Sequence, residues 1–166
     1  MFIKPSDPRL VYCGRIDFDN ADAPVMVYAS SYVAFRFTGS YVKVRLTNKR
    51  SCWSNRMGCI VDGVQTAVLL SEDDAEHEYL IYTDEYEKQN GSSDEKTWHE
   101  LMFFKRQDSA DYVILHGFEL DDGAELAASE SEKEKKLKLE VYGDSVSCGE
   151  VSEAVGYVGK QDPVHN

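Results

Sequence analysis

Two short segments in which apolar and polar residues alternate constrain the fold of this chain more than any other feature. They are Tyr32–Phe37 and residues 41–47, separated by the turn residues Thr38, Gly39 and Ser40. The apolar members all fall on one side of an extended chain: Val33, Phe35 and Phe37, then Val42, Val44 and Leu46. Because successive side chains of a strand point to opposite faces, this period of two predicts half-buried antiparallel strands.

Further strand-like segments occur along the chain, before and after these two, and turn residues separate them. They cover residues 10–18, 57–61, 64–70, 78–83, 97–106 and 112–120. Asp62 and Gly63 stand between residues 57–61 and 64–70. A two-residue hairpin turn needs positive φ angles, which Asp-Gly adopts readily, so the pair predicts a β-hairpin. Residues 71–78 and 84–96 are predicted loops. Eight or nine short strands without an amphipathic helix predict an all-β sandwich or jelly roll.

The end of this sandwich is less regular. Residues 124–136 contain helix-forming residues but no apolar stripe, which fits a linker or a short solvated helix. We favour the linker.

The charge of the chain excludes some classes of partner. Its 166 residues contain 18 basic and 30 acidic side chains, a net charge of -12. Residues 1–70 hold 9 basic and 5 acidic residues, a balance of +4, so residues 71–166 hold 9 and 25, a balance of -16. A field of this sign repels phosphate backbones and anionic lipid, which predicts no nucleic-acid partner and no membrane partner.

The cysteines and the first residues carry little functional signal. Cys13, Cys52, Cys59 and Cys148 form no CxxC pair, and no histidine lies at metal-ligand spacing to them. We therefore expect buried or free thiols and no metal site. No signal peptide is visible after Met1, which favours a cytoplasmic location, or a secreted one if a signal was removed.

A different pattern begins after residue 136. Leu137, Leu139 and Val141 alternate and lead into Gly143, Asp144 and Ser145. A serine at the end of a strand and just before a helix stands exposed above a parallel sheet, and its own backbone N–H can point at a developing oxyanion. Gly143 and Gly149 would permit tight turns beside it. Ser145 is thus a candidate nucleophile, with an incidental turn serine as the alternative.

The block from Gly143 to Gly149 resembles the first conserved block of SGNH (GDSL-type) hydrolases, in particular the acetyl-esterases of carbohydrate esterase family 2. Ser147 stands where that family usually has threonine, and the chain departs from the family pattern from Glu150 onward. Five upstream segments resemble the N-terminal jelly roll of those enzymes in the same order: residues 14–18, 34–40, 61–63, 99–106 and 116–124.

This resemblance implies an all-β jelly-roll β-sandwich over residues 1–135, followed at residues 136–166 by the first strand of a truncated α/β SGNH hydrolase domain. Ser145 would be the nucleophile, and Gly143, Asp144 and Gly149 would form its turn, with no cofactor. The implied partners are acetylated plant polysaccharide or oligosaccharide and the missing hydrolase domain. Only 166 − 145 = 21 residues follow the serine. The family's remaining oxyanion-hole residues and its catalytic histidine lie further downstream, so we expect the chain alone to be inactive.

The four histidines do not match the family's catalytic position. His99 and His116 fall in predicted strands, His77 lies in an acidic stretch, and His165 is one residue from the end. We expect structural or solvated roles for them.

Two other functions remain open. Exposed aromatic rings stack on sugars, so Trp53 and Trp98, with outward residues such as Tyr32 and Tyr41, could make the sandwich a non-catalytic carbohydrate-binding module. It could also be a purely structural accessory domain.

Overall fold

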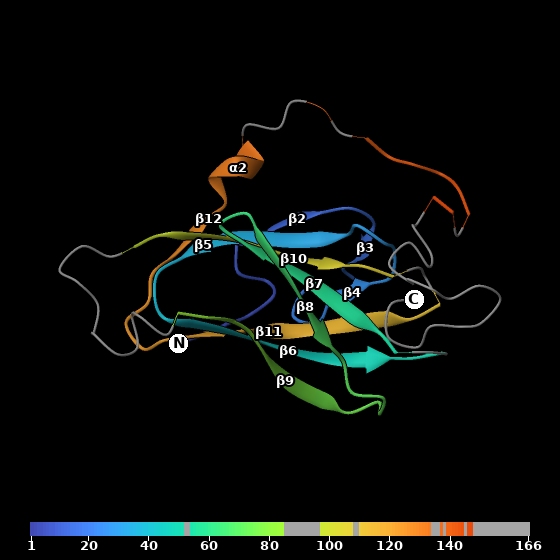
Figure 1. Cartoon of the computed structure of the whole chain (residues 1–166), viewed down its shortest axis with the longest axis horizontal. Coiled ribbons are helices and arrows are strands. Elements are labelled where there is room, and N and C mark those ends of the chain that lie inside the picture. The colour runs from blue at the N-terminus through green and yellow to red at the C-terminus, as the bar shows by residue number, and fades with distance from the viewer. Residues whose placement is uncertain are drawn as a thin grey trace.

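The computed structural model describes residues 1–51, 54–84, 97–107, 110–133, 137, 139–144 and 146–147. Two antiparallel sheets pack face to face (Figure 1), and the predicted jelly-roll β-sandwich is confirmed. No helix among these residues is both long and apolar enough to cross a membrane.

Each sheet is assembled from strands that are distant in the chain. Sheet A has the order β3 (Ile16–Asp17), β4 (Val25–Met26), β11 (Tyr112–Leu120), β6 (Tyr41–Lys49) and β9 (Glu76–Thr83), with β1 (Phe2–Ile3) also on β11. Sheet B has the order β12 (Leu126–Ala128), β5 (Tyr32–Phe37), β10 (His99–Lys105), β7 (Arg56–Val61) and β8 (Val64–Leu69), with β2 (Val11–Cys13) also on β5. A single helical turn, α2 (Glu130–Lys133), follows β12.

The turn at residues 38–40 carries the chain from one sheet to the other. β5 lies in sheet B and β6 in sheet A, so the two alternating segments face each other across the core and do not pair. Gly39 adopts a φ of 116°, and the Asp121 carboxylate accepts hydrogen bonds from the backbone N–H groups of Ser40 and Tyr41. One carboxylate thus accepts hydrogen bonds from the two backbone N–H groups at the start of β6.

The predicted hairpin is confirmed at β7 and β8. Val61 pairs with Val64, and the two residues between them have the required positive φ angles, 50° at Asp62 and 82° at Gly63.

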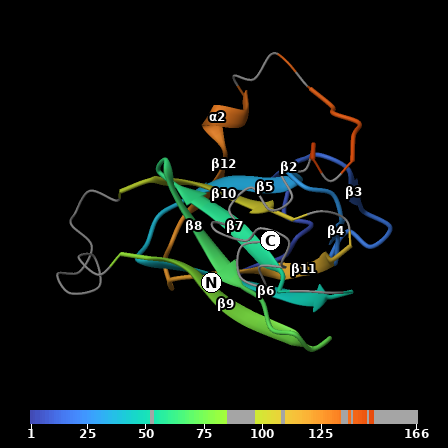
Figure 2. The same ribbon diagram turned by 45° about the vertical axis from the view of Figure 1, so that its right-hand side comes forward.

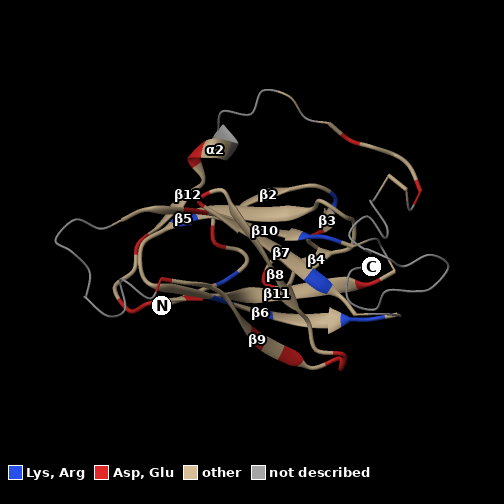
Figure 3. Ribbon diagram, in the orientation of Figure 1, with Lys and Arg blue, Asp and Glu red and all other residues tan. Residues whose placement is uncertain are grey.

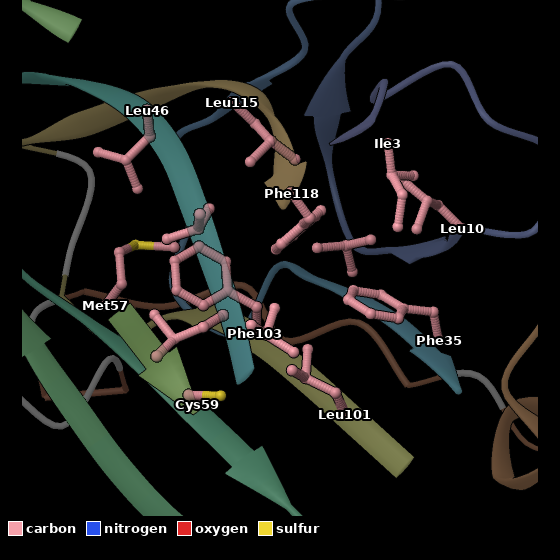
Figure 4. Packing of buried hydrophobic residues seen from close by; sticks show 14 of the residues in the cluster. Ile3, Leu10, Phe35, Leu46, Met57, Cys59, Leu101, Phe103, Leu115 and Phe118 are labelled. Carbon is pink, nitrogen blue, oxygen red and sulfur yellow. The ribbon is translucent and has the colours of Figure 1, made fainter. Parts of the chain in front are cut away.

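The core lies between the sheets and is built by their inward-facing positions. Phe35, Phe103 and Phe118 have no exposed surface, and their rings meet edge to face, with centroids 5.0 Å apart for Phe35 and Phe118 and 6.0 Å apart for Phe103 and Phe118. Figure 4 shows these rings among the aliphatic side chains and the Cys59 thiol. Burial raises the pKa of Cys59 to about 12, so this thiol is neutral at physiological pH.

Several predicted boundaries in the sandwich are wrong. The single strand expected over residues 10–18 is two strands, β2 and β3, because Gly14 breaks it with a φ of 99°. β9 begins at Glu76, inside the predicted loop of residues 71–78. The favoured linker over residues 124–136 contains β12, which pairs with β5 and buries Leu126, and the turn α2. Residues 85–96 of the other predicted loop lie outside the described residues.

The strand expected around residues 137–141 is not formed. Residues 137 and 139–144 are in neither sheet, and Leu137, Leu139 and Val141 are 82%, 83% and 68% exposed. A strand requires a neighbour for its backbone hydrogen bonds, and no described strand lies beside this segment to supply them.

Candidate functional site

The predicted nucleophile turn is described on both sides of its serine. Ser145, Gly149 and Trp53 themselves lie outside the described residues. Asp144 organises the turn: its Oδ1 accepts a hydrogen bond from the Val146 N–H (3.1 Å), and its carbonyl oxygen accepts one from the Ser147 N–H (3.0 Å). A side chain at Gly143 would collide with that of Ser147. Gly143 therefore leaves room for the Ser147 side chain, and Asp144 accepts two hydrogen bonds from backbone N–H groups of the turn.

The residues just before the turn are held by Arg15, which lies 125 positions away from Glu140. The Arg15 Nη2 donates to the Glu140 Oε1 at 2.6 Å and to the Tyr142 hydroxyl at 2.8 Å. The Tyr142 hydroxyl in turn donates to the Glu140 Oε2 at 2.9 Å. We call these three residues the Arg15 clamp. In Figures 1 and 2 the orange-red residues 139–144 lie on the outer side of sheet B, on the side of β2 and β3.

Aromatic rings flank the guanidinium of this clamp. The Arg15 Cζ lies 5.4 Å from the ring centroid of Tyr142 and 5.8 Å from that of Tyr28. A planar guanidinium next to aromatic faces gains cation–π attraction and keeps its edge free for bidentate hydrogen bonds. The arrangement orients Arg15 toward the segment that carries the candidate nucleophile.

Charge and hydrogen bonding reinforce each other in the clamp. The hydrogen bond from Tyr142 and then the one from Arg15 hold the pKa of Glu140 below its ordinary value. The hydrogen bond to Glu140 raises the pKa of Arg15. Both groups are therefore fully ionised at neutral pH, which is the state in which a charge-assisted pair is strongest.

Gly14 explains how Arg15 reaches this position. Its φ of 99° lies in the region that favours glycine, and a Cβ there would be 2.8 Å from the Oγ and 2.9 Å from the Cα of buried Ser31. The turn between β2 and β3 therefore packs its backbone directly on the chain that enters β5. The backbone from which the Arg15 side chain extends is therefore fixed by this packing.

The three predicted aromatic candidates that the structure describes are not gathered on one platform. Trp98 is half-buried, and its ring lies 5.1 Å from the guanidinium carbon of Arg36. Tyr32 pairs with Phe104, at the other end of β10 from Trp98, while Tyr41 lies on sheet A. Each ring is used locally, for instance by the Lys43 ammonium, which lies 5.6 Å from the Tyr41 ring.

The described histidines are all engaged within the sandwich. The Nδ1 of buried His99 lies 2.7 Å from the Asp62 Oδ2, the Nε2 of His116 lies 2.8 Å from the Thr47 Oγ1, and His77 lies 2.6 Å from the Asp73 Oδ1. His165 lies outside the described residues. Where the structure describes the chain, no three His, Cys, Asp or Glu side chains gather as metal ligands would.

Sequence reasoning missed the Arg15 clamp. The pair Gly14 and Arg15 drew attention only through its resemblance to a family segment, and Glu140 and Tyr142 appeared only as the polar positions between apolar ones. One signal was available: Glu140 and Tyr142 alternate with Leu139 and Val141, so they must share a face in an extended chain.

Comparisons with known proteins point to one family. The sequence model of the family described as carbohydrate esterase 2 N-terminal matches residues 12–129. A family two carbohydrate esterase from Cellvibrio japonicus is similar over 99% of this chain and 44% of its own, with 18% identity and a TM-score of 0.63. No match was found among the curated proteins.

Two further solved structures share the fold. An acetyl xylan esterase from Butyrivibrio proteoclasticus is similar over 77% of this chain and 33% of its own, with 14% identity and a TM-score of 0.60. A family two carbohydrate esterase from Clostridium thermocellum, solved with cellohexaose, is similar over 72% of this chain and 33% of its own, with 20% identity and a TM-score of 0.57. The chain thus spans 33% to 44% of the length of these enzymes.

Proposed function

Because this chain belongs to the carbohydrate esterase 2 N-terminal family, we propose that it is the N-terminal portion of an acetylxylan-type carbohydrate esterase. Residues 1–135 are the sandwich, and residues 136–166 begin an SGNH hydrolase domain. One observation carries the proposal: the family match ends at residue 129, and beyond α2 the chain has an exposed alternating segment that leads into the turn at Gly143 and Asp144.

The substrate class that we propose is an acetylated plant polysaccharide or its oligomers. Two relatives support it, since the Butyrivibrio enzyme is an acetyl xylan esterase and the Clostridium enzyme was solved with cellohexaose. The net charge of -12 also suits a neutral polysaccharide better than a polyanionic one, because like charges repel.

The reaction that we propose is serine acyl transfer. The Ser145 hydroxyl attacks the carbonyl carbon of the acetyl ester, its proton passes to a base, and the sugar hydroxyl leaves with that proton. Water then attacks the acetyl-enzyme and releases acetate. Gly143, Asp144 and Gly149 shape the turn so that backbone N–H groups face the oxyanion. No cofactor takes part.

The base in this mechanism comes from outside the sandwich. His77, His99 and His116 lie on strands of the two sheets and already contact Asp73, Asp62 and Thr47. We therefore assign the base to a histidine of the hydrolase domain in a longer protein.

Hydrolysis of p-nitrophenyl acetate tests the proposal. We expect no turnover by the 166-residue chain, turnover by a longer protein that carries the hydrolase domain, and its loss in Ser145→Ala. Ser131→Ala, which changes an exposed serine of α2, is the matched control and should retain activity. Turnover by the longer protein that survives Ser145→Ala would refute the proposed nucleophile. Turnover by the short chain that Ser145→Ala abolishes would show that the short chain is a complete enzyme.

A second candidate function is carbohydrate binding by the sandwich itself. It is favoured by Trp98, which is half-buried and keeps part of its surface exposed just before β10, beside Arg36. Isothermal titration with xylan or cello-oligosaccharides tests it. Binding lost in Trp98→Ala or Trp53→Ala, but retained in Tyr41→Ala on the other sheet, would support this function. If the unmodified chain binds neither ligand, carbohydrate binding is excluded and a purely structural role remains for the sandwich.

A further inference from the structure

We propose that Arg15 is a positioning residue for the nucleophile turn, through which the sandwich sets the place and direction of the segment that ends in Ser145. This inference rests on the proposed function and assigns a role to a residue of the sandwich that the proposed reaction leaves unused. Arg15 does not touch the reacting atoms in this proposal. It acts through Glu140 and Tyr142.

The first argument is the completeness of the Arg15 clamp. Three hydrogen bonds of 2.6, 2.8 and 2.9 Å close a ring among Arg15, Glu140 and Tyr142, so both oxygens of the carboxylate and the tyrosine hydroxyl are engaged. A lone ion pair between exposed groups contributes little, because each long side chain loses conformational entropy. A planar guanidinium that binds two groups and contacts an aromatic ring restricts direction as well as distance.

The second argument is which face of the segment the clamp takes. Glu140 and Tyr142 lie on the polar side of the alternating segment, while Leu139 and Val141 lie on the other side and are 83% and 68% exposed. Arg15 therefore binds the segment without covering the apolar side chains. Those side chains remain free to be buried by a hydrolase domain.

The third argument is the stiffness of the connection on both sides of the clamp. On the sandwich side, the Gly14 backbone packs against buried Ser31. The Arg15 backbone therefore cannot shift without moving the chain that enters β5. On the other side, Asp144 follows Tyr142 by two residues and accepts hydrogen bonds from the N–H groups of Val146 and Ser147, the two residues that come after Ser145 in the sequence. A displacement at Tyr142 would therefore reach the serine.

The first experiment needs no activity and uses the 166-residue chain. The Glu140 carboxyl is titrated by NMR, and amide hydrogen exchange is followed over residues 139–147, in the unmodified chain, Arg15→Lys and Arg15→Ala. We expect Arg15→Ala to raise the pKa of Glu140 toward its ordinary value and to speed exchange several-fold, with Arg15→Lys between the two. Arg45→Ala is the matched control. Arg45 also contacts two carboxylates, but on sheet A, and its loss should leave both readouts unchanged.

The second experiment uses the longer protein with the hydrolase domain. We expect Arg15→Ala to lower kcat for p-nitrophenyl acetate roughly tenfold to a hundredfold with little change in KM, because a displaced nucleophile slows the acyl transfer step. Arg15→Lys should restore part of kcat, and Arg45→Ala should keep the activity of the unmodified protein.

The outcomes separate this inference from the proposed function. An unchanged Glu140 pKa in Arg15→Ala would overturn the clamp, whatever the activity. A shifted Glu140 pKa with an unchanged kcat would overturn the positioning role and leave the proposed esterase intact. A longer protein without any esterase activity would overturn the proposed function and the positioning role with it, while the NMR titration would still establish the contact.

Discussion

The outer faces of the two sheets are stabilised by different chemistry. On sheet A, Lys43 and Arg45 of β6 lie between Glu78 of β9 and Glu119 of β11, with ion pairs of 2.8 to 3.8 Å. Figure 3 shows acidic positions on β9 beside basic positions on β6. On sheet B, Arg36 of β5 pairs with Glu100 of β10 and with Glu130 of α2, but these ion pairs do not continue along the other outward positions of β5 and β10. Two rows of mostly apolar residues cross sheet B instead: Val11, Ala34, Met102 and Ile60, and next to them Tyr32, Phe104, Gly58 and Ala67.

This difference shows that strand alternation describes only one side of each sheet. Both sheets bury the same kind of inner face, but sheet A presents charges to water, and sheet B packs aromatic and aliphatic side chains against its own backbone. The ring of Phe104 lies over Gly58, where any side chain would collide with it. We therefore expect mutations on the outer face of sheet B to change stability more than mutations on that of sheet A.

The largest expected effect separates the inner from the outer face of β10. Phe103 is fully buried in the core, whereas its neighbour Phe104 is partly exposed on the outer face. Phe103→Ala should lower the free energy of unfolding by about 3–5 kcal/mol, because it leaves a cavity. Phe104→Ala should lower it by about 1–2 kcal/mol, because the Phe104 side chain buries less apolar surface on folding than the Phe103 side chain does. Urea denaturation measures both. An equal loss in the two variants would mean that this outer face is as deeply covered as the core.

Phe103 and Phe104 also show how far the sequence predicts the fold. The inward residues of the alternating segments follow from the period of two, and the hairpin at Asp62 follows from the φ angles that a two-residue turn requires. The sheet in which each strand lies does not follow, because a turn such as residues 38–40 can join paired strands or cross the core. Met102 and Phe104 add apolar residues on the second face, so alternation does not reveal that face.

The candidate site was predictable only in part. Gly143, Asp144 and Ser145 stand together in the sequence, so local pattern and resemblance identify them. The segment just before that turn is held by Arg15, which is distant in the chain, and no local pattern connects the two. Strand β12 was missed for a related reason: Leu126 is buried only because β5 is there to pair with it. Contacts of this kind depend on the assembled fold.

A medium effect tests how the aromatic ring packs on sheet B. Gly58→Ala should lower the free energy of unfolding by about 1–3 kcal/mol, because the new methyl group forces the Phe104 ring off the sheet. In the double variant with Phe104→Ala the collision is removed, so Gly58→Ala should then have little further effect. The four proteins form a double-mutant cycle in urea denaturation. Additive losses would show that the ring and the glycine do not interact.

The smallest effect is expected on sheet A, at Glu78. Hydrogen bonds from Lys43 and then Arg45 hold the pKa of Glu78 below its ordinary value of 4.5. A carboxyl whose pKa is lowered on folding stabilises the fold above its unfolded pKa, and this contribution is lost as the pH falls through the folded pKa. Glu78→Gln should therefore lower Tm at pH 7 by no more than about 2 °C, since exposed ion pairs contribute little.

That difference should shrink below about pH 4 and in high salt, because protonation and screening remove the same attraction. Thermal melts of the two proteins at several pH values and salt concentrations measure it, with Gln65→Glu on the outer face of sheet B as the control for a change of one charge. A Tm difference for Glu78→Gln larger than the one for Phe104→Ala would reverse the comparison. The charged outer face of sheet A would then contribute more to the stability of the sandwich than the apolar outer face of sheet B.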